Sequence, residues 1–134
     1  MIEKTLSIIK PDAVERNLVD DIKSIFAKNN LSVKDSKKIH ISKEEASEFY
    51  KVHQSKPFYD ALCSYLSSGP IFVMILEGEN AILENRRIMG ATNPKDAEPN
   101  TIRKMYGVSI DKNSVHGSDS LENAKKEINF FFKN

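Results

Sequence analysis

The sequence predicts a single α+β domain, spanning residues 1–134, in which helices cover an antiparallel β-sheet. A chain of 134 residues suits one domain, and neither an internal repeat nor a Ser/Gly-rich linker divides it. Apolar residues make up 40% and charged residues 29% of the chain, which is enough for a packed core. Strand-like and helix-like patterns alternate, but with too few strand–helix–strand units for a doubly wound parallel sheet.

The N-terminal part predicts a strand, a helix and a second strand. β-Branched residues in Lys4–Lys10 indicate the first strand. Pro11 suits the first position of a helix, and apolar residues then recur at helical spacing as far as Phe26. Apolar and polar side chains alternate over residues 31–41, which predicts a second strand with a polar middle.

Two helices and a buried strand are expected next. The stretch "SKEE", Ser42 to Glu45, is typical of a capping box that opens a helix. A further helix is expected from about Phe58 to Ser67, with Gly69-Pro70 ending it. The unbroken apolar run "IFVMIL", Ile71 to Leu76, predicts a central strand that is buried on both faces.

The C-terminal part is less regular. The stretch "ENAILENRRIMG" predicts a short helix closed by Gly90, and a last helix begins near Ser120. Between Ala91 and Gly117 only a brief helical turn is expected, around Thr101 to Met105, and such long irregular segments are usually functional or mobile. The order of elements suits the β-α-β-β-α-β ferredoxin-like arrangement, an antiparallel sheet with helices on one face.

The composition also limits the function. A formal net charge of +1 argues against a domain that neutralises many nucleic-acid phosphates. Cys63 is the only cysteine, so no intrachain disulfide can form, and a reducing compartment fits. The start of the chain lacks the pattern of a signal peptide, and "IFVMIL" is too short to span a bilayer. We therefore expect a cytoplasmic protein without membrane or nucleic-acid partners.

His116, in the stretch "NSVHGSDS", is the first candidate for chemistry. It could be a structural histidine at the end of a short strand. Three features favour a functional one: Gly117 allows close approach of a ligand, residues 118–120 stand where a helix N-terminus could attract an anion, and the preceding segment is irregular. Neutral imidazole is a competent nucleophile at cell pH, and Glu127 on the last helix could hold one of its nitrogens.

Three cations and one aromatic ring could form a nucleotide site. Lys10 lies on the apolar side of the first strand, where it would need an anion, unless Pro11 ends the strand and lets it reach water. Together with Arg86 and Arg103 it would make a phosphate clamp, because guanidinium forks match phosphate oxygens. Phe58 is either a core residue or an exposed ring that stacks on a nucleobase. P-loop, G-x-G-x-x-G and protein-kinase motifs are missing, and the His and Cys spacings do not suit a structural zinc.

Four blocks of the sequence resemble one family, nucleoside diphosphate kinase. They are "TLSIIKPDAV", "ENAILENRRIMGATNP", "TIR" and "NSVHGSDS", in the order that the family shows. The resemblance runs from about Lys4 to Phe132, and the short tail is similar to bacterial forms. It implies that the γ-phosphoryl of a nucleoside triphosphate, mainly ATP, moves to a nucleoside diphosphate by a ping-pong reaction through a phosphohistidine.

The resemblance also implies a set of site residues. His116 would be the nucleophile at its pros nitrogen, and Glu127 would orient it. Magnesium would travel on the nucleotide phosphates without a direct protein ligand. The implied neighbours of the histidine are Tyr50 and Ser118, and the implied nucleotide contacts are Lys10, Phe58, Leu62, Arg86, Thr92, Arg103 and Asn113.

Two departures and two alternatives accompany this resemblance. Asp20 and Asn100 stand where many members have glycine, which bears on turn geometry rather than on the chemistry. Longer members continue beyond the position of Asn134 into an extension that contacts neighbouring subunits, and the short tail here leaves tetramer and hexamer both open. The resemblance implies a homo-oligomer, at least a dimer. The alternative functions are a histidine phosphocarrier or protein-histidine kinase, and a catalytically silent binding module on the same fold.

Overall fold

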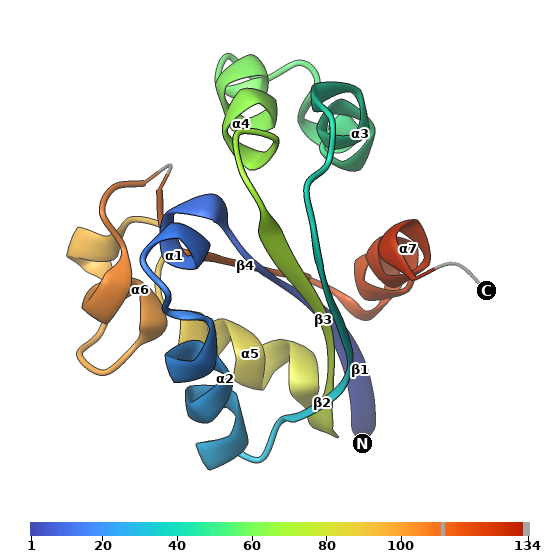
Figure 1. Cartoon of the computed structure of the whole chain (residues 1–134). Helices are drawn as coiled ribbons and strands as arrows, with labels where there is room; N and C mark the ends of the chain where they lie inside the picture. The colour runs from blue at the N-terminus through green and yellow to red at the C-terminus, as the bar shows by residue number, and fades with distance from the viewer. Residues whose placement is uncertain (111, 133–134) are drawn as a thin grey trace.

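A four-stranded antiparallel sheet forms the centre of the fold (Figure 1). The computed structural model describes residues 1–110 and 112–132. The strands lie side by side in the order β2-β3-β1-β4, and every neighbouring pair is antiparallel, which confirms the predicted sheet and the central place of Ile71–Leu76. The strand bounds are β1 Ile2–Ile9, β2 Ser32–Ile39, β3 Ile71–Glu79 and β4 Val115–Gly117.

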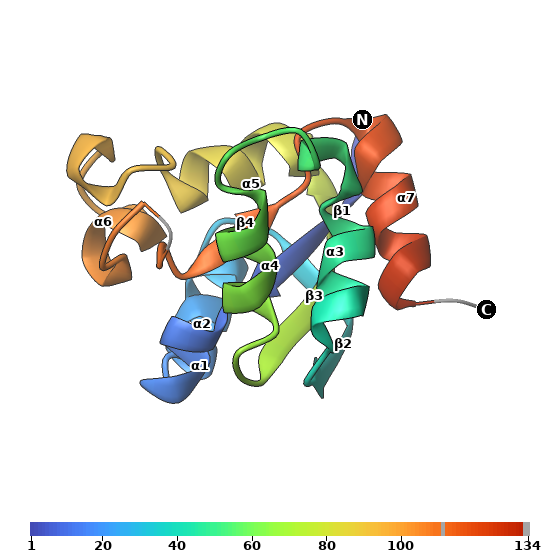
Figure 2. The same cartoon turned by 90° about the horizontal axis from the view of Figure 1, so that it is seen from above.

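Helices cover both faces of this sheet, so the expectation of helices on one face is wrong. The reason is the alternation of side chains along the two central strands. Met74 and Leu76 of β3 pack into one buried cluster with α2 and α5, whereas Ile71 and Val73 pack into a second one with α3, α4 and α7. Figure 2 shows α7 on one side of the strands and α2 on the other. A sheet that is apolar on both sides needs cover on both sides.

The helices follow the predicted order, with one break. The helix expected after Pro11 is two helices, because Asn17 between them adopts a φ of 61°. The predicted capping box at Ser42 and Glu45 is present, and Gly90 closes α5 with a φ of 87°. The bounds are α1 Pro11–Glu15, α2 Val19–Lys28, α3 Lys43–Phe49, α4 Tyr59–Leu66, α5 Ala81–Met89, α6 Ile102–Tyr106 and α7 Leu121–Phe131, with 3₁₀ turns at Lys51–His53 and Pro94–Asp96.

Positive φ angles mark several turns of the chain. Among the described residues other than glycine they occur at Asn17, Asn30, Asn80, Asn100 and Ser114. Asparagine tolerates this left-handed region better than most residues, because its short polar side chain bonds locally. Asn100, with a φ of 70°, therefore takes up a backbone conformation that glycine adopts readily. The other departure, Asp20, lies in the first turn of α2, where a carboxylate suits the helix dipole.

The short strand β4, at one edge of the sheet, places His116 beside the end of β1. It pairs with the end of β1, where His116 lies opposite Ile8 and Gly117 opposite Ser7.

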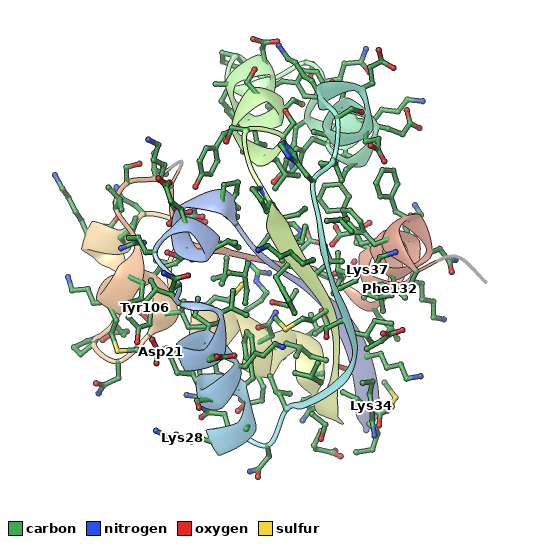
Figure 3. The ribbon with its side chains drawn as sticks, viewed as in Figure 1. Asp21, Lys28, Lys34, Lys37, Tyr106 and Phe132 are labelled. Carbon is green, nitrogen blue, oxygen red and sulfur yellow. The ribbon has the colours of Figure 1, made fainter. Side chains whose placement is uncertain are left out.

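At the other edge of the sheet, Lys37 of β2 lies over the ring of Phe132, with Nζ 5.0 Å from the ring centroid (Figure 3). Within the described ranges, none of the helices has the length and apolar character needed to cross a bilayer.

Candidate active site

His116 is held by a carboxylate from the last helix. Its Nε2 lies 2.9 Å from Oε1 of Glu127, and the hydroxyl of Ser118 donates to the same oxygen at 2.8 Å. A carboxylate accepts the Nε2 proton and so favours the tautomer with a lone pair on Nδ1. Among the described residues we find no hydrogen bond to Nδ1. Two of the residues predicted around the histidine, Glu127 and Ser118, therefore lie against it, and one ring nitrogen is left for chemistry.

Aromatic rings pack around this histidine. Phe49 meets its ring edge-on, with centroids 5.3 Å apart, and the Tyr50 ring lies 6.4 Å away at a steep angle. Tyr50 is only 5% exposed. Burial, together with the charge of Glu127, raises the pKa of the Tyr50 phenol above its ordinary value. The phenol therefore stays protonated and can donate a hydrogen bond at neutral pH.

A cleft of about 500 Å³ opens beside the histidine. It collects residues from α4, α5, α6, the segment before β4 and the ends of β1 and α3. Nine of the eleven predicted site residues line it, while Ser118 and Glu127 lie behind the histidine. The nine are Lys10, Tyr50, Phe58, Leu62, Arg86, Thr92, Arg103, Asn113 and His116.

Lys10 is buried, which resolves the choice that the sequence left open. The residue is 6% exposed, and its Nζ donates to Oδ1 of Asn113 at 2.9 Å. The amide of Asn113 in turn donates to the backbone carbonyl of Thr92 at 3.0 Å. A chain of hydrogen bonds thus joins three segments that are far apart in sequence, and it presents an ammonium group at the cleft.

Arg103 and Arg86 add two more cations to the lining of the cleft. The Arg103 guanidinium donates to the carbonyls of Gly90 at 3.0 Å and Val115 at 2.9 Å, so the side chain is fixed in place. Burial and the like charge of Arg86 lower the pKa of Arg103 to about 10, which leaves it charged at neutral pH. A buried guanidinium group that also feels the like charge of the exposed Arg86 favours an anionic ligand, because an anion offsets both the repulsion and the desolvation of Arg103.

Phe58 is not a core residue. It is 47% exposed at the N-cap of α4, and Leu62 lies one turn further along the same helix. Both side chains line the cleft. A large exposed ring with an aliphatic neighbour offers a flat apolar surface, which suits stacking of a nucleobase without reading its edges.

The start of α7 does not provide the anion site that the sequence suggested. The hydroxyl of Ser120 accepts the N–H of Asn123, and Ser118 is turned towards Glu127. Asp119 accepts a hydrogen bond from the Asn123 side chain, which lowers the pKa of that carboxyl below its usual value. The cations that line the cleft are instead Lys10, Arg86 and Arg103.

Some cleft residues escaped the sequence reasoning. His53, Met89 and Ile110 also line it. His53 lies in a 3₁₀ turn with its ring 5.9 Å from that of Phe58, and no periodic signal in the sequence marks it. Across residues 1–110 and 112–132 no group of three or more His, Cys, Asp or Glu side chains could hold a metal ion.

The comparisons with known proteins all indicate the same family. The family model of nucleoside diphosphate kinase matches residues 3–134. The nucleoside diphosphate kinase of a Nitratiruptor species is 56% identical over 131 residues, covering 98% of this chain and 96% of the relative. That of Nitrosococcus oceani is 54% identical over 133 residues, covering 99% and 93%. A crystal structure of the Aquifex aeolicus enzyme superposes with a TM-score of 0.98 at 40% identity, covering 100% of this chain and 97% of that one.

Proposed function

Since this chain belongs to the nucleoside diphosphate kinase family and is therefore a phosphotransferase, we propose that it works through a phosphohistidine at His116. The γ-phosphoryl of a nucleoside triphosphate, mainly ATP, moves first to the histidine and then to a nucleoside diphosphate. The observation that carries this proposal is the hydrogen bond between Nε2 and Glu127, which leaves Nδ1, the pros nitrogen, as the nucleophile.

The first half-reaction forms one bond and breaks one. The Nδ1 lone pair attacks the γ-phosphorus, and the bond to the bridging oxygen breaks, so the nucleoside diphosphate leaves with that electron pair. The Nε2 proton stays shared with Glu127, which stabilises the positive charge that develops on the ring. In the second half-reaction an oxygen of an acceptor diphosphate attacks the phosphohistidine, and His116 is restored.

Three cations stabilise the transferring phosphoryl group. Lys10, Arg86 and Arg103 line the cleft beside the nucleophile, where they would meet charge on the equatorial oxygens. Asn113 orients Lys10 through its 2.9 Å hydrogen bond, and Tyr50 adds a protonated phenol. Thr92 contributes a further polar contact at the cleft wall.

The opposite end of the cleft would hold the base. Phe58 would stack on it and Leu62 would pack beside it, without hydrogen bonds to the base edges. Such a platform accepts purines and pyrimidines alike. That tolerance suits an enzyme whose donor and acceptor nucleotides differ in their bases.

Magnesium, assembly and location complete the proposal. Magnesium would enter on the nucleotide phosphates, where it screens their charge, because the described residues offer no acidic cage for it. We place the enzyme in the cytoplasm as a homo-oligomer built from dimers, either a tetramer or a hexamer. Its partners are nucleoside tri- and diphosphates.

Intact mass spectrometry at neutral pH tests the mechanism. The protein is incubated with magnesium and ATP without an acceptor and weighed, then given GDP and weighed again, with a His116→Ala variant as the control. One phosphoryl group that appears and is then lost to GDP, with GTP formed, is the expected result.

The other outcomes separate the alternative functions. A phosphoryl group that forms but stays on the protein would indicate a histidine phosphocarrier. No phosphoryl group at all would indicate a silent module. Turnover by His116→Ala would refute the assignment of the nucleophile.

A further inference from the structure

A buried carboxylate outside the cleft joins several parts of the site. Asp12, in the first turn of α1, is 8% exposed. Its Oδ1 accepts the hydroxyl of Tyr65, and its Oδ2 accepts the hydroxyl of Ser114 at 2.9 Å and a guanidinium N–H of Arg16 at 3.1 Å. Asp12 and these three partners do not line the cleft itself. They are therefore not explained by direct contact with a nucleotide.

The first contact leads to the base-binding helix. Tyr65 lies on α4, the helix that carries Leu62 and begins just after Phe58. Its hydroxyl donates to the Asp12 carboxylate and also accepts the Asp12 backbone N–H at 2.8 Å. Burial and the hydrogen bond to Asp12 raise the pKa of Tyr65, so this hydroxyl stays a donor. Two hydrogen bonds thus hold α4 to the start of α1.

The second contact leads to the phosphate end. Ser114 is fully buried with a φ of 74°, and it lies next to Asn113. Its carbonyl accepts the Lys10 backbone N–H at 2.8 Å, while its hydroxyl donates to Asp12. Ser114 is thus hydrogen-bonded to the residues before and after Pro11. These two hydrogen bonds fix the position of the segment from which Asn113 contacts the Lys10 ammonium.

The third contact leads to the helix of Arg103. The same Arg16 nitrogen that donates to Asp12 also donates to the carbonyl of Tyr106, the last residue of α6. Arg103 lies on that helix, one turn before Tyr106. One carboxylate is therefore linked to α4, to the segment before β4 and, through Arg16, to α6.

We propose that Asp12 is a positioning residue: its carboxylate holds the base-binding helix α4 at a set distance from the Lys10–Asn113 pair. This rests on the proposed function, because it takes Phe58 and Lys10 to hold opposite ends of one nucleotide. A ligand that spans both ends depends on that distance. A ligand that occupies only the phosphate end does not.

Two tyrosines of α4 provide a matched test. Tyr65→Phe removes the hydroxyl that reaches Asp12 and keeps the ring. Tyr59→Phe removes a hydroxyl of the same helix that donates instead to the carbonyl of Ser47 at 2.8 Å. Tyr65→Phe loses two hydrogen bonds, one of them to a carboxylate, and Tyr59→Phe loses one, so the larger fall in melting temperature is expected for Tyr65→Phe. The test therefore depends on the ratio of two ligand affinities and not on stability. Calorimetric titration then compares the affinities for magnesium-ADP and for magnesium-pyrophosphate, which has no base.

The expected result is a selective loss. Tyr65→Phe should raise the Kd for ADP about five- to tenfold and leave that for pyrophosphate within about twofold, whereas Tyr59→Phe should change neither. Ser114→Ala, at the phosphate end, should weaken both ligands. The proposal is overturned if Tyr65→Phe and Tyr59→Phe give the same ratio of the two affinities, or if Tyr65→Phe weakens both ligands equally.

Failure of the proposed function has a different signature. It would appear in the unmodified protein, as the absence of a phosphohistidine after incubation with ATP. The comparison of the two tyrosine variants needs only binding of ADP and pyrophosphate, so it reports on Asp12 even if no phosphohistidine forms; a protein that binds no ADP would refute both proposals.

Discussion

Replacing Glu127 by alanine should slow the phosphorylation of His116 by about tenfold. The carboxylate fixes the ring through a 2.9 Å contact to Nε2, and both side chains are 21% exposed. Without it, the ring can rotate and can place its proton on Nδ1, where the nucleophilic lone pair is needed. The intermediate should therefore still form, but from a smaller population of correctly oriented histidine.

The size of the effect follows from the contact. A hydrogen bond to a charged group contributes about 1.5–3 kcal/mol, and partial exposure puts this one near the lower end, at about 1.5 kcal/mol. Since about 1.4 kcal/mol corresponds to a factor of ten in rate, the loss is about tenfold. Glu127→Gln keeps an acceptor oxygen without the charge, so about half of that energy and a loss of about threefold are expected.

The assay is a rapid-quench measurement of a single turnover. The chain has no tryptophan, so labelled phosphate from ATP is counted on the protein instead of following indole fluorescence. Glu122→Ala is the matched control, because Glu122 also lies on α7 but is 81% exposed and, within residues 1–110 and 112–132, forms an ion pair only with Lys126. The reasoning is refuted if Glu127→Ala reacts as fast as the control, or if Glu127→Gln reacts more slowly than Glu127→Ala.

Three further outcomes are expected. Phe58→Ala should weaken binding of ADP and GDP alike, by about tenfold in titration calorimetry; a loss confined to one base would contradict the stacking platform. Gly117→Ala should lower the free energy of unfolding by about 1–3 kcal/mol in a denaturant titration, because the added Cβ would lie 2.3 Å from Nδ2 of the buried Asn85. Gly69→Ala, whose Cβ meets Pro11 at an ordinary 3.6 Å, is its control, and equal losses would contradict the packing argument. EDTA should abolish phosphohistidine formation with ATP without changing the melting temperature of the free protein; a lower melting temperature would instead indicate a metal held by the protein.

Local signals in the sequence were sufficient for most of the elements. The capping box at Ser42 and the closing Gly90 work through groups a few residues apart, so a short stretch determines them. The same holds for Ile71–Leu76, whose unbroken apolar character required a central strand. The break at Asn17 was missed because helical spacing of apolar residues continues across it.

Long-range arrangement could not be predicted in the same way. Lys10 bonds to Asn113, 103 positions away, and only the pairing of β4 with β1 brings them together. Whether the lysine met water or the cleft therefore depended on tertiary structure. The family resemblance supplied the list of cleft residues, but it gave no role to Asp12, because a carboxylate in a first helical turn is explained by the helix dipole alone.

The asparagines at positive φ affect the unfolded chain as well as the folded one. Glycine is scarce, at 5 of 134 residues, and Asn17, Asn30, Asn80 and Asn100 adopt left-handed conformations instead. Glycine at these turns would relieve backbone strain, but it would also give the denatured ensemble more conformations to lose on folding. The side chain of asparagine narrows that ensemble while still permitting the turn. Four reversals of the chain are thus partly encoded before any tertiary contact forms, which lowers the conformational entropy that folding has to remove.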